Sequence, residues 1–136
     1  MLEKTNLVST RNSTPEDKNF ILATWLRGLY YGDSWFREIR KDIFMENYHK
    51  VIENILARPG VSVQVACLKD DPEVILGYSV SRGNTLDWVF IKAAWRGIGI
   101  AKSLLPKDLN VVTHLTKPGL SILKKKLPEV VFNPFA

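Results

Sequence analysis

The stretch Arg96-Gly97-Ile98-Gly99-Ile100-Ala101 joins an apolar segment to an amphipathic one. Residues 85–92 before it are rich in β-branched and aromatic side chains, which predicts a strand. Apolar residues recur at helical spacing after it, which predicts a helix from Gly97 to about Leu105. Glycines let a backbone approach a ligand closely, and a helix start offers unpaired N–H donors. The stretch is therefore expected to bind an anionic group.

Two known phosphate loops do not fit this stretch. The dinucleotide fingerprint G-x-G-x-x-G matches Gly97 and Gly99, but Lys102 stands where its third glycine belongs, and no acidic residue follows about twenty positions later. The nucleoside triphosphate loop requires glycine where this chain has Arg96 and Ala101. Both loops fail at the positions that carry their chemistry.

A third known motif does match this stretch. Residues 91–105 resemble motif A of the GNAT superfamily of acyl-coenzyme A dependent N-acetyltransferases, whose core is Q/R-x-x-G-x-G/A, and Arg96, Gly99 and Ala101 fill its three defined places. The proline that ends the preceding strand in the family is replaced here by Ala93. Residues 20–105 also look like small GNAT-like proteins encoded by tailed bacteriophages.

The resemblance implies an α/β (mixed α+β) fold with a central, mostly antiparallel sheet. This sheet is expected to be splayed at the strand before motif A and covered by helices on both faces. Hydrophobic periodicity along the chain predicts the order β, α, α, β, β, β, α, β, α, β, which is the order of the family through its sixth strand. The first helix is expected to begin at a capping box of Thr14 and Asp17 and to bury one apolar stripe, formed by Leu22, Trp25, Leu26 and Leu29. We expect one GNAT-like domain over residues 1–136, truncated before the seventh strand that is common in the family.

Composition limits the other classes of function. The 136 residues are 46% hydrophobic and 24% charged, which is typical of one globular domain. One cysteine and two histidines predict neither a disulfide nor a metal site. Residues 1–6 show no signal-peptide pattern and no apolar run could span a bilayer, so a cytoplasmic protein without a membrane partner is expected.

The net charge of +5 favours anionic partners, such as nucleic acid or a phosphorylated cofactor. The run Lys124-Lys125-Lys126 is read either as a solvated helix face or as a nucleic-acid patch.

The family resemblance implies acetyl-CoA as the cofactor. Backbone amides after Arg96 would hold its pyrophosphate, with charge from Arg96 and Lys102, and the strand before motif A would pair with its pantetheine arm. The expected cofactor-binding residues are Phe90, Ile91, Lys92, Arg96, Gly97, Ile98, Gly99, Ile100, Ala101 and Lys102.

The implied reaction is transfer of an acetyl group to a primary amine by direct attack. Asp87 is the expected base, because it is the one acid inside an apolar strand, on the face of Val89 and Ile91, where a raised pKa would suit it. The alternative is a carboxylate bonded at a strand edge. Leu123 occupies the place of the tyrosine acid of the family, so Ser121 is its substitute by proximity alone.

The acceptor amine, in a protein or a small molecule, is expected near the loop joining the first two helices, predicted at residues 30–36. Tyr30 and Tyr31 would line its slot, or alternatively pack in the core. His114 has no acidic residue nearby in sequence and is expected to be structural.

The sequence is also compatible with two other functions. A GNAT-fold CoA-binding protein with weak or no turnover would account for Leu123, and a basic modifier associated with nucleic acid would account for the charge. Pairing of two copies across an exposed sheet edge, giving a homodimer, is a further expectation.

Overall fold

The structure of the chain is a computed structural model that describes residues 4–136, without the side chains of residues 4, 5, 117 and 118. The strands are β1 (Val8–Asn12), β2 (Val61–Leu68), β3 (Asp71–Arg82), β4 (Thr85–Ile91), β5 (Val111–Val112) and β6 (Val131–Phe132). The helices are α1 (Lys18–Gly32), α2 (Ser34–Arg37), α3 (Lys41–Leu56), α4 (Ile100–Leu104) and α5 (Lys117–Lys126). Short 3₁₀ segments span Lys4–Leu7, Pro15–Asp17 and Ala93–Trp95.

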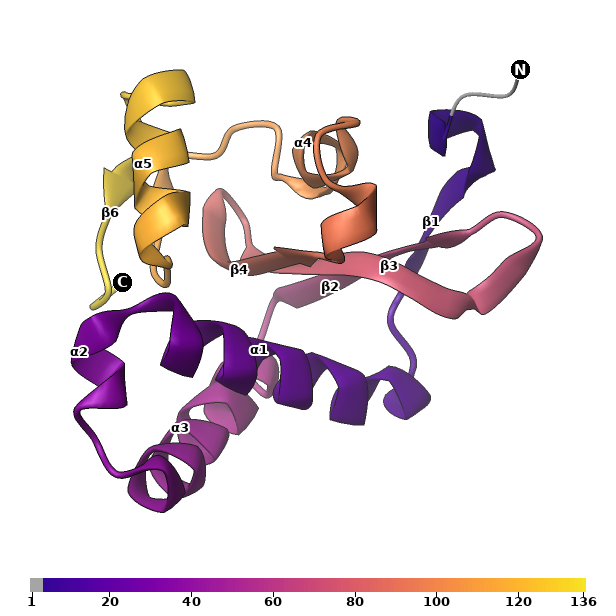
Figure 1. The fold of residues 1–136 in the computed structure, drawn as a ribbon. Coiled ribbons are helices and arrows are strands. Elements are labelled where there is room, and N and C mark those ends of the chain that lie inside the picture. The colour runs from indigo at the N-terminus through magenta and orange to yellow at the C-terminus, as the bar shows by residue number, and fades with distance from the viewer. Residues whose placement is uncertain (1–3) are drawn as a thin grey trace.

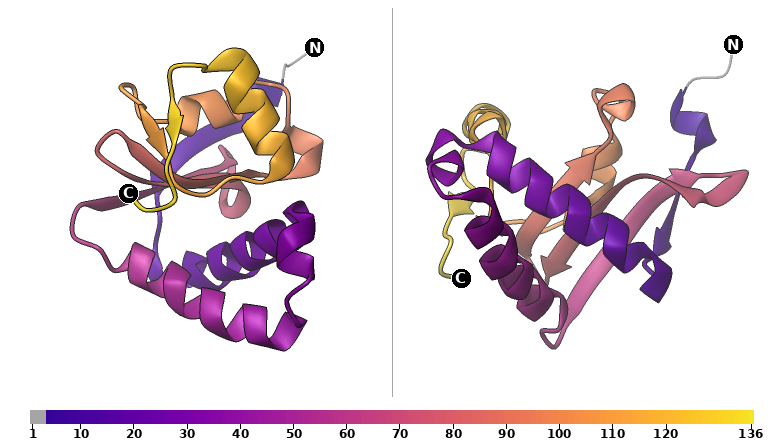
Figure 2. Two further views of the ribbon diagram at one scale, coloured as in Figure 1. Left: turned by 90° about the vertical axis from the view of Figure 1, so that its left-hand side faces the viewer. Right: turned by 60° about the horizontal axis from the view of Figure 1, so that its bottom comes forward.

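The described strands form one sheet in the order β1-β2-β3-β4-β5-β6. Pairing is antiparallel from β1 to β4 and parallel for β4 with β5 and β5 with β6. The parallel pairs are joined by helical crossovers: α4 connects β4 to β5, and α5 connects β5 to β6. Such a crossover lets the second strand run in the same direction as the first. Helices α1 to α3 cover one face, and α4 and α5 cover the other (Figures 1 and 2). The predicted mixed sheet with helices on both faces is confirmed.

The main core lies between the sheet and helices α1 and α3. Leu22, Trp25, Leu26 and Leu29, the predicted apolar stripe of the first helix, are all buried. Trp25 stacks on Trp88 of β4, with ring centroids 5.6 Å apart and planes 5° apart. This face of the sheet is therefore packed with large aromatic rings.

The opposite face carries two separate clusters. Beneath α4, the buried residues are Ala66, Ile91, Ile100 and Leu104, and beneath α5 they are Leu86, Val112 and Leu123. The packing divides where β4 and β5 part. The two strands pair only at Thr85 with Val111 and Leu86 with Val112. One more backbone bond, from Thr113 N–H to the Leu86 carbonyl at 3.0 Å, closes the pairing. The predicted splay of the sheet is confirmed at this point.

Helix α4 is shorter than the sequence predicts. It spans Ile100–Leu104 rather than beginning at Gly97, because Gly97 and Gly99 adopt φ values of 82° and 91° that a right-handed helix excludes. The five-residue helix is anchored at its end, where the buried Ser79 hydroxyl donates to the Leu104 carbonyl at 2.9 Å. The glycine segment is thus an irregular turn followed by one helical turn.

Strand β4 contains a bulge that the sequence does not reveal. Ser81 of β3 pairs with Leu86 while Val80 pairs with Trp88, so Asp87 is an additional residue between them. The alternation of side chains breaks there. Asp87 therefore does not share a face with Val89 and Ile91, which corrects the prediction.

A buried ion pair fixes the start of α1. The Asp17 carboxylate, 5% exposed, accepts bonds from Arg11 at 2.7 and 3.0 Å and from the Thr14 backbone N–H at 2.7 Å. These bonds, the Arg11 bond foremost, hold the pKa of Asp17 below its usual value despite burial. The predicted capping box of Thr14 and Asp17 is confirmed.

We expect Asp17→Asn to lower the free energy of unfolding by about 1–3 kcal/mol at pH 7. Because the folded-state pKa is depressed, this contribution is present above about pH 4 and is lost as the pH falls through the folded pKa. Urea unfolding across pH measures it. Asp42→Asn is the control, since Asp42 pairs with Arg40 on the surface. An equal loss in both variants would contradict the account.

Candidate functional site

The turn before α4 exposes backbone donors. The N–H groups of Gly99, Ile100, Ala101 and Lys102 donate to no protein acceptor within residues 4–136, whereas Ser103 N–H reaches the Gly99 carbonyl at 3.2 Å. A side chain at Gly97 or Gly99 would meet open space, so the two glycines are required by their positive φ and not by crowding. Four adjacent unpaired donors at the surface form a cradle for an anion.

The free edge of β4 lies beside this turn. Lys92 N–H donates to the Leu76 carbonyl of β3 at 2.8 Å, so the backbone groups of Phe90 and Lys92 face β3 and those of Val89 and Ile91 face away. The Ile91 carbonyl confirms this direction, since it accepts Arg96 Nε at 2.9 Å. Of the three strand residues predicted to pair with a ligand, only Ile91 presents its backbone to the open edge.

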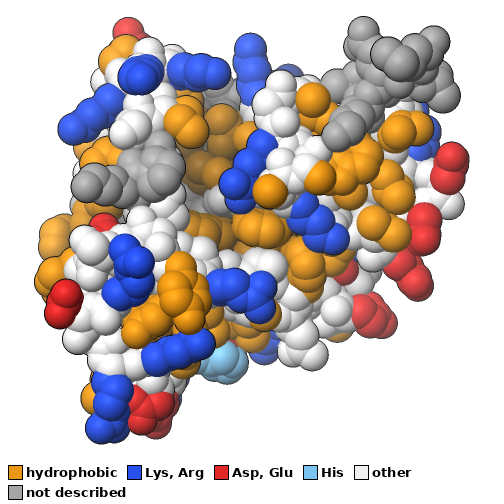
Figure 3. Space-filling view, viewed as in Figure 1, with side chains coloured by type: hydrophobic (Ala, Val, Ile, Leu, Met, Phe, Trp, Pro, Cys, Tyr) orange, Lys and Arg blue, Asp and Glu red, His pale blue; other side chains and the backbone are white. Residues whose placement is uncertain are grey.

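The turn, the free edge and α5 border one cleft. In Figure 3 the surface is hollowed between α4 and α5, with Lys and Arg side chains beside the hollow. The Lys92 side chain lies elsewhere, because its ammonium sits 5.5 Å from the Phe20 ring centroid on the α1 side. Arg96 and Lys102 are exposed at the turn.

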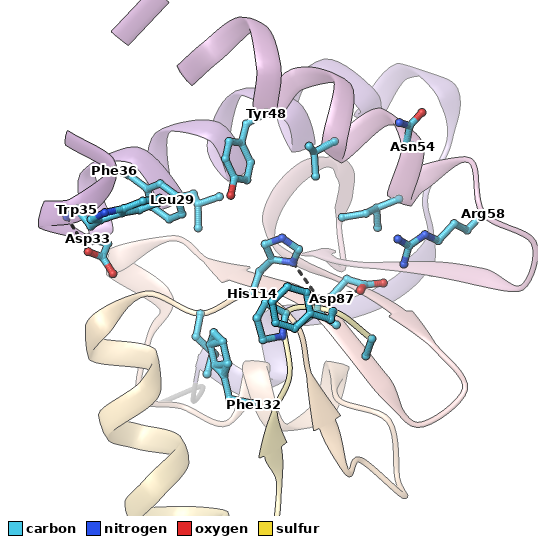
Figure 4. A pocket seen from close by; sticks show the side chains of 17 residues that line it. Leu29, Asp33, Trp35, Phe36, Tyr48, Asn54, Arg58, Asp87, His114 and Phe132 are labelled. Atoms are coloured by element: carbon cyan, nitrogen blue, oxygen red, sulfur yellow. Dashed lines mark hydrogen bonds between the residues drawn. The ribbon is translucent and has the colours of Figure 1, made fainter. Parts of the chain in front are cut away.

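A cavity of about 640 Å³ opens on the other face, between the sheet, helices α1 to α3 and the C-terminal residues from Phe132 onward. Figure 4 shows His114 and Asp87 on its sheet side, with Tyr48 pointing toward His114 from α3. The rest of the lining is mostly apolar, with Leu29 and Phe36 among its members, but it also includes Asp33, Asn54 and Arg58. The cavity and the cleft thus meet the sheet near the point where β4 and β5 part.

Asp87 is held at the floor of this cavity. Its carboxylate is 1% exposed and accepts Arg82 Nε at 2.9 Å, Arg82 Nη2 at 3.0 Å and the Thr113 hydroxyl at 2.8 Å. The carboxylate is therefore paired with a cation and a hydroxyl, and no amide bonds it among the described residues. The Thr113 oxygen lies 2.9 Å from His114 Nδ1, which extends the chain of bonds into the cavity.

Sequence reasoning missed Arg82, Thr113 and His114 as members of one cluster. The signal was the register of the parallel strands, because pairing of Leu86 with Val112 sets Asp87 beside Thr113. That register could not be read from periodicity, since β5 has only two residues.

The predicted acceptor residues lie in the last turn of α1 and not in a loop. Tyr30 is a core residue, 8% exposed, whose hydroxyl donates to the Ile39 carbonyl at 3.0 Å, so its predicted place in a substrate slot is wrong. Tyr31 is half exposed beneath the Lys41 ammonium, 5.4 Å from its ring centroid. Neither residue lines the cavity; the helix continues to Gly32 instead of ending before them.

The predicted acid Ser121 is exposed on α5 and is not brought to the Asp87 cluster, whereas Leu123 of the same helix is buried against Leu86 and Val112. The lysines 124–126 are exposed at its end. Among residues 4–136 no three His, Cys, Asp or Glu side chains gather to hold a metal, and no described helix has the length and apolarity to cross a membrane.

Solved structures share this architecture. A Pyrococcus furiosus structure that bears the name acetyl transferase gives a TM-score of 0.67 at 13% identity, over 88% of this chain and 91% of that one. A GCN5-related N-acetyltransferase (GNAT) from Rhodopseudomonas palustris gives 0.50 at 16% identity, over 72% and 61% of the two chains. This chain has the GNAT fold.

At sequence identities this low, the similarity to these solved structures is a similarity of fold alone. An assigned acetyltransferase from Salmonella typhimurium, solved with its cofactor acetyl-CoA, gives a TM-score of 0.44 at 17% identity over 71% and 58% of the two chains, a fit too loose to place a ligand here. No protein-family model and no curated protein matches the sequence.

Arg82→Met leaves the buried Asp87 carboxylate without its cation, and we expect it to cost about 3–5 kcal/mol of stability. The double variant Arg82→Met/Asp87→Asn removes the charge as well and should be more stable than the single variant. Urea unfolding of both compares them. Equal stability of the two would show that Asp87 is not a buried charge held by Arg82.

Proposed function

We propose that the protein is an N-acetyltransferase that moves an acetyl group from acetyl-CoA to the primary amine of an acceptor. The observation that carries the proposal is the run of unpaired N–H groups from Gly99 to Lys102, placed where a GNAT fold leaves the edge of β4 open. A ligand with an anionic head and an amide-bearing arm matches these two features together.

The residues present fit such a cofactor. The backbone of Gly99 to Lys102 would bind the pyrophosphate, and Arg96 and Lys102 would add positive charge at an exposed surface. Because α4 has only five residues, the local N–H groups supply this binding and a long helix dipole does not. Gly97 and Gly99 serve by shaping the turn.

The open edge of β4 would bind the arm as an added strand. The outward backbone groups of Val89 and Ile91 are the partners that the geometry offers, so Val89 replaces Phe90 and Lys92 in this role. Arg96 already bonds the Ile91 carbonyl, and that bond ties the phosphate turn to the strand. Of the two outward N–H groups, that of Val89 lies nearer the point where β4 and β5 part, so it is the donor that would stabilise charge on the carbonyl oxygen of the thioester.

The chemistry supplied by acetyl-CoA is an activated acetyl group on a thiol leaving group. The chain supplies binding, orientation and removal of the proton from the amine. Leu123 is buried with Leu86 and Val112, so no acid stands at its position, and the departing thiolate would take its proton from solvent or from the amine. Binding of the cofactor without turnover is the alternative outcome, and it keeps the cleft while losing the reaction.

Gly97→Ala tests the cradle against a matched control. Gly97 and Gly60 have φ values of 82° and 78°, and a Cβ at either position would meet open space, so alanine strains both backbones alike. We expect Gly97→Ala to weaken acetyl-CoA binding at least about tenfold in isothermal titration, which is 1.4 kcal/mol, while Gly60→Ala binds as the parent protein does. Equal binding by all three proteins would remove the cradle from the proposal.

A further inference from the structure

His114 stands at the meeting point of the cavity and the cleft. It lies two residues after Val112, which ends β5 and forms the last pair with β4, and it lines the cavity beneath α1 and α3. Its ring packs edge-on against Trp25, with centroids 6.0 Å apart and planes 80° apart. The ring is therefore fixed on one side by the core and open on the other to the cavity (Figure 4).

The directions of the hydrogen bonds determine which ring nitrogen carries the proton. A carboxylate can only accept hydrogen bonds, so the Thr113 hydroxyl donates its single hydrogen to Asp87 Oδ1 at 2.8 Å. Because that hydrogen is used, the Thr113 hydroxyl oxygen must accept a hydrogen bond from His114 Nδ1 at 2.9 Å. Nδ1 therefore carries the hydrogen, and Nε2 of the neutral ring keeps a free lone pair.

Burial keeps the His114 ring neutral near pH 7. Burial, with a smaller contribution from the Arg58 charge, lowers the pKa of His114, and the nearby Asp87 carboxylate only partly offsets this. Burial raises the pKa of Tyr48, which faces the ring from α3 and stays a neutral phenol. Asp33 and Arg58 also line the cavity, as does Ala136 with the terminal carboxylate. Arg82 pairs with Asp87 and also donates to the Ala136 oxygen at 3.3 Å.

We infer that His114 Nε2 is the group that takes the proton from the acceptor amine, with Thr113, Asp87 and Arg82 as the positioning residues behind it. This inference rests on the proposed acetyl transfer. The acceptor approaches through the cavity, on the opposite face of the sheet from the phosphate cradle. An arm added along Val89 and Ile91 ends where β4 and β5 part, beside Thr113 and His114. Both partners of the reaction thus reach the same point.

The lining of the cavity indicates the class of acceptor. Leu29, Trp35, Phe36, Tyr48 and Ile55 contribute aromatic and aliphatic surface, and 640 Å³ accommodates a small molecule. Asp33, Asn54 and Arg58 also line the cavity, but apolar side chains form most of the lining, which favours a primary amine with an aromatic or aliphatic body over a polyamine. The acceptor is accordingly a small apolar amine.

The proton and electron pairs balance in this step. The ammonium of the acceptor gives one proton to His114 Nε2, and the freed amine nitrogen attacks the thioester carbon. The new C–N bond forms as the C–S bond breaks, the sulfur leaves with the electron pair, and the second amine proton ends on that thiolate. His114 then releases its proton to solvent, which restores the neutral ring.

Release of CoA thiol with phenylethylamine as the acceptor tests the role of the ring. We expect His114→Gln to lower kcat/KM by about 10²-fold or more and to remove the fall in rate toward acid pH that a protonated base causes. His49→Gln is the matched control, because the other histidine is exposed on α3 beside Glu53. An unchanged rate and pH profile in His114→Gln, with acetyl-CoA still bound, would overturn the inference alone.

Thr113 tests the chain of bonds separately from catalysis. Nitrogen NMR of the ring should show the Nδ1–H form in the parent protein and in Thr113→Ser, whereas Thr113→Val should show no preference for that form. The rate of acetyl transfer should fall in Thr113→Val and stay near that of the parent protein in Thr113→Ser. A dominant Nε2–H form in the parent protein would contradict the assigned geometry.

Spermidine compared with phenylethylamine tests the acceptor class, and we expect kcat/KM to favour phenylethylamine at least about tenfold. Equal use of both amines would overturn the acceptor class. If the parent protein binds no acetyl-CoA and acetylates neither amine, the proposed function fails first, and the role of His114 fails with it.

Discussion

The parting of β4 and β5 after Leu86 and Val112 is the constraint on which the rest of the structure depends. A parallel pair that continued would fill the edge of β4 and leave no backbone group for a ligand. Here the pair ends after two residues in each strand, and the packing on the α4 side divides into two clusters at the same place. The opening is therefore built into the sheet and does not depend on a mobile loop.

Two structural features maintain that opening. The bulge at Asp87 turns its carboxylate toward Arg82 and Thr113, which ties β3, β4 and β5 together just before they part. Arg96 bonds the Ile91 carbonyl and keeps the phosphate turn against the strand. A buried ion pair of this kind contributes more to specific geometry than to net stability, so we interpret the Asp87 cluster as a positioning element.

Local signals in the sequence predicted the order of elements well. The apolar stripe of α1, its capping box and the glycine turn each follow from side chains a few residues apart, and each is confirmed. The bulge and the ends of the short strands were missed, because they depend on pairing between segments distant in sequence. Tyr30 was misplaced for a related reason: α1 runs to Gly32, and its buried face takes in that ring. His114 looked isolated in sequence, but the register of β4 and β5 gives it a partner.

Backbone amide NMR during titration with acetyl-CoA tests the central claim most directly, since it observes the open edge of β4 and the phosphate turn at single residues. We predict large shifts at Val89, Ile91 and Gly99 to Lys102, with Val63 and Val65 in the interior of the sheet nearly unmoved. Shifts confined to other surfaces, or none at saturating acetyl-CoA, would contradict this claim.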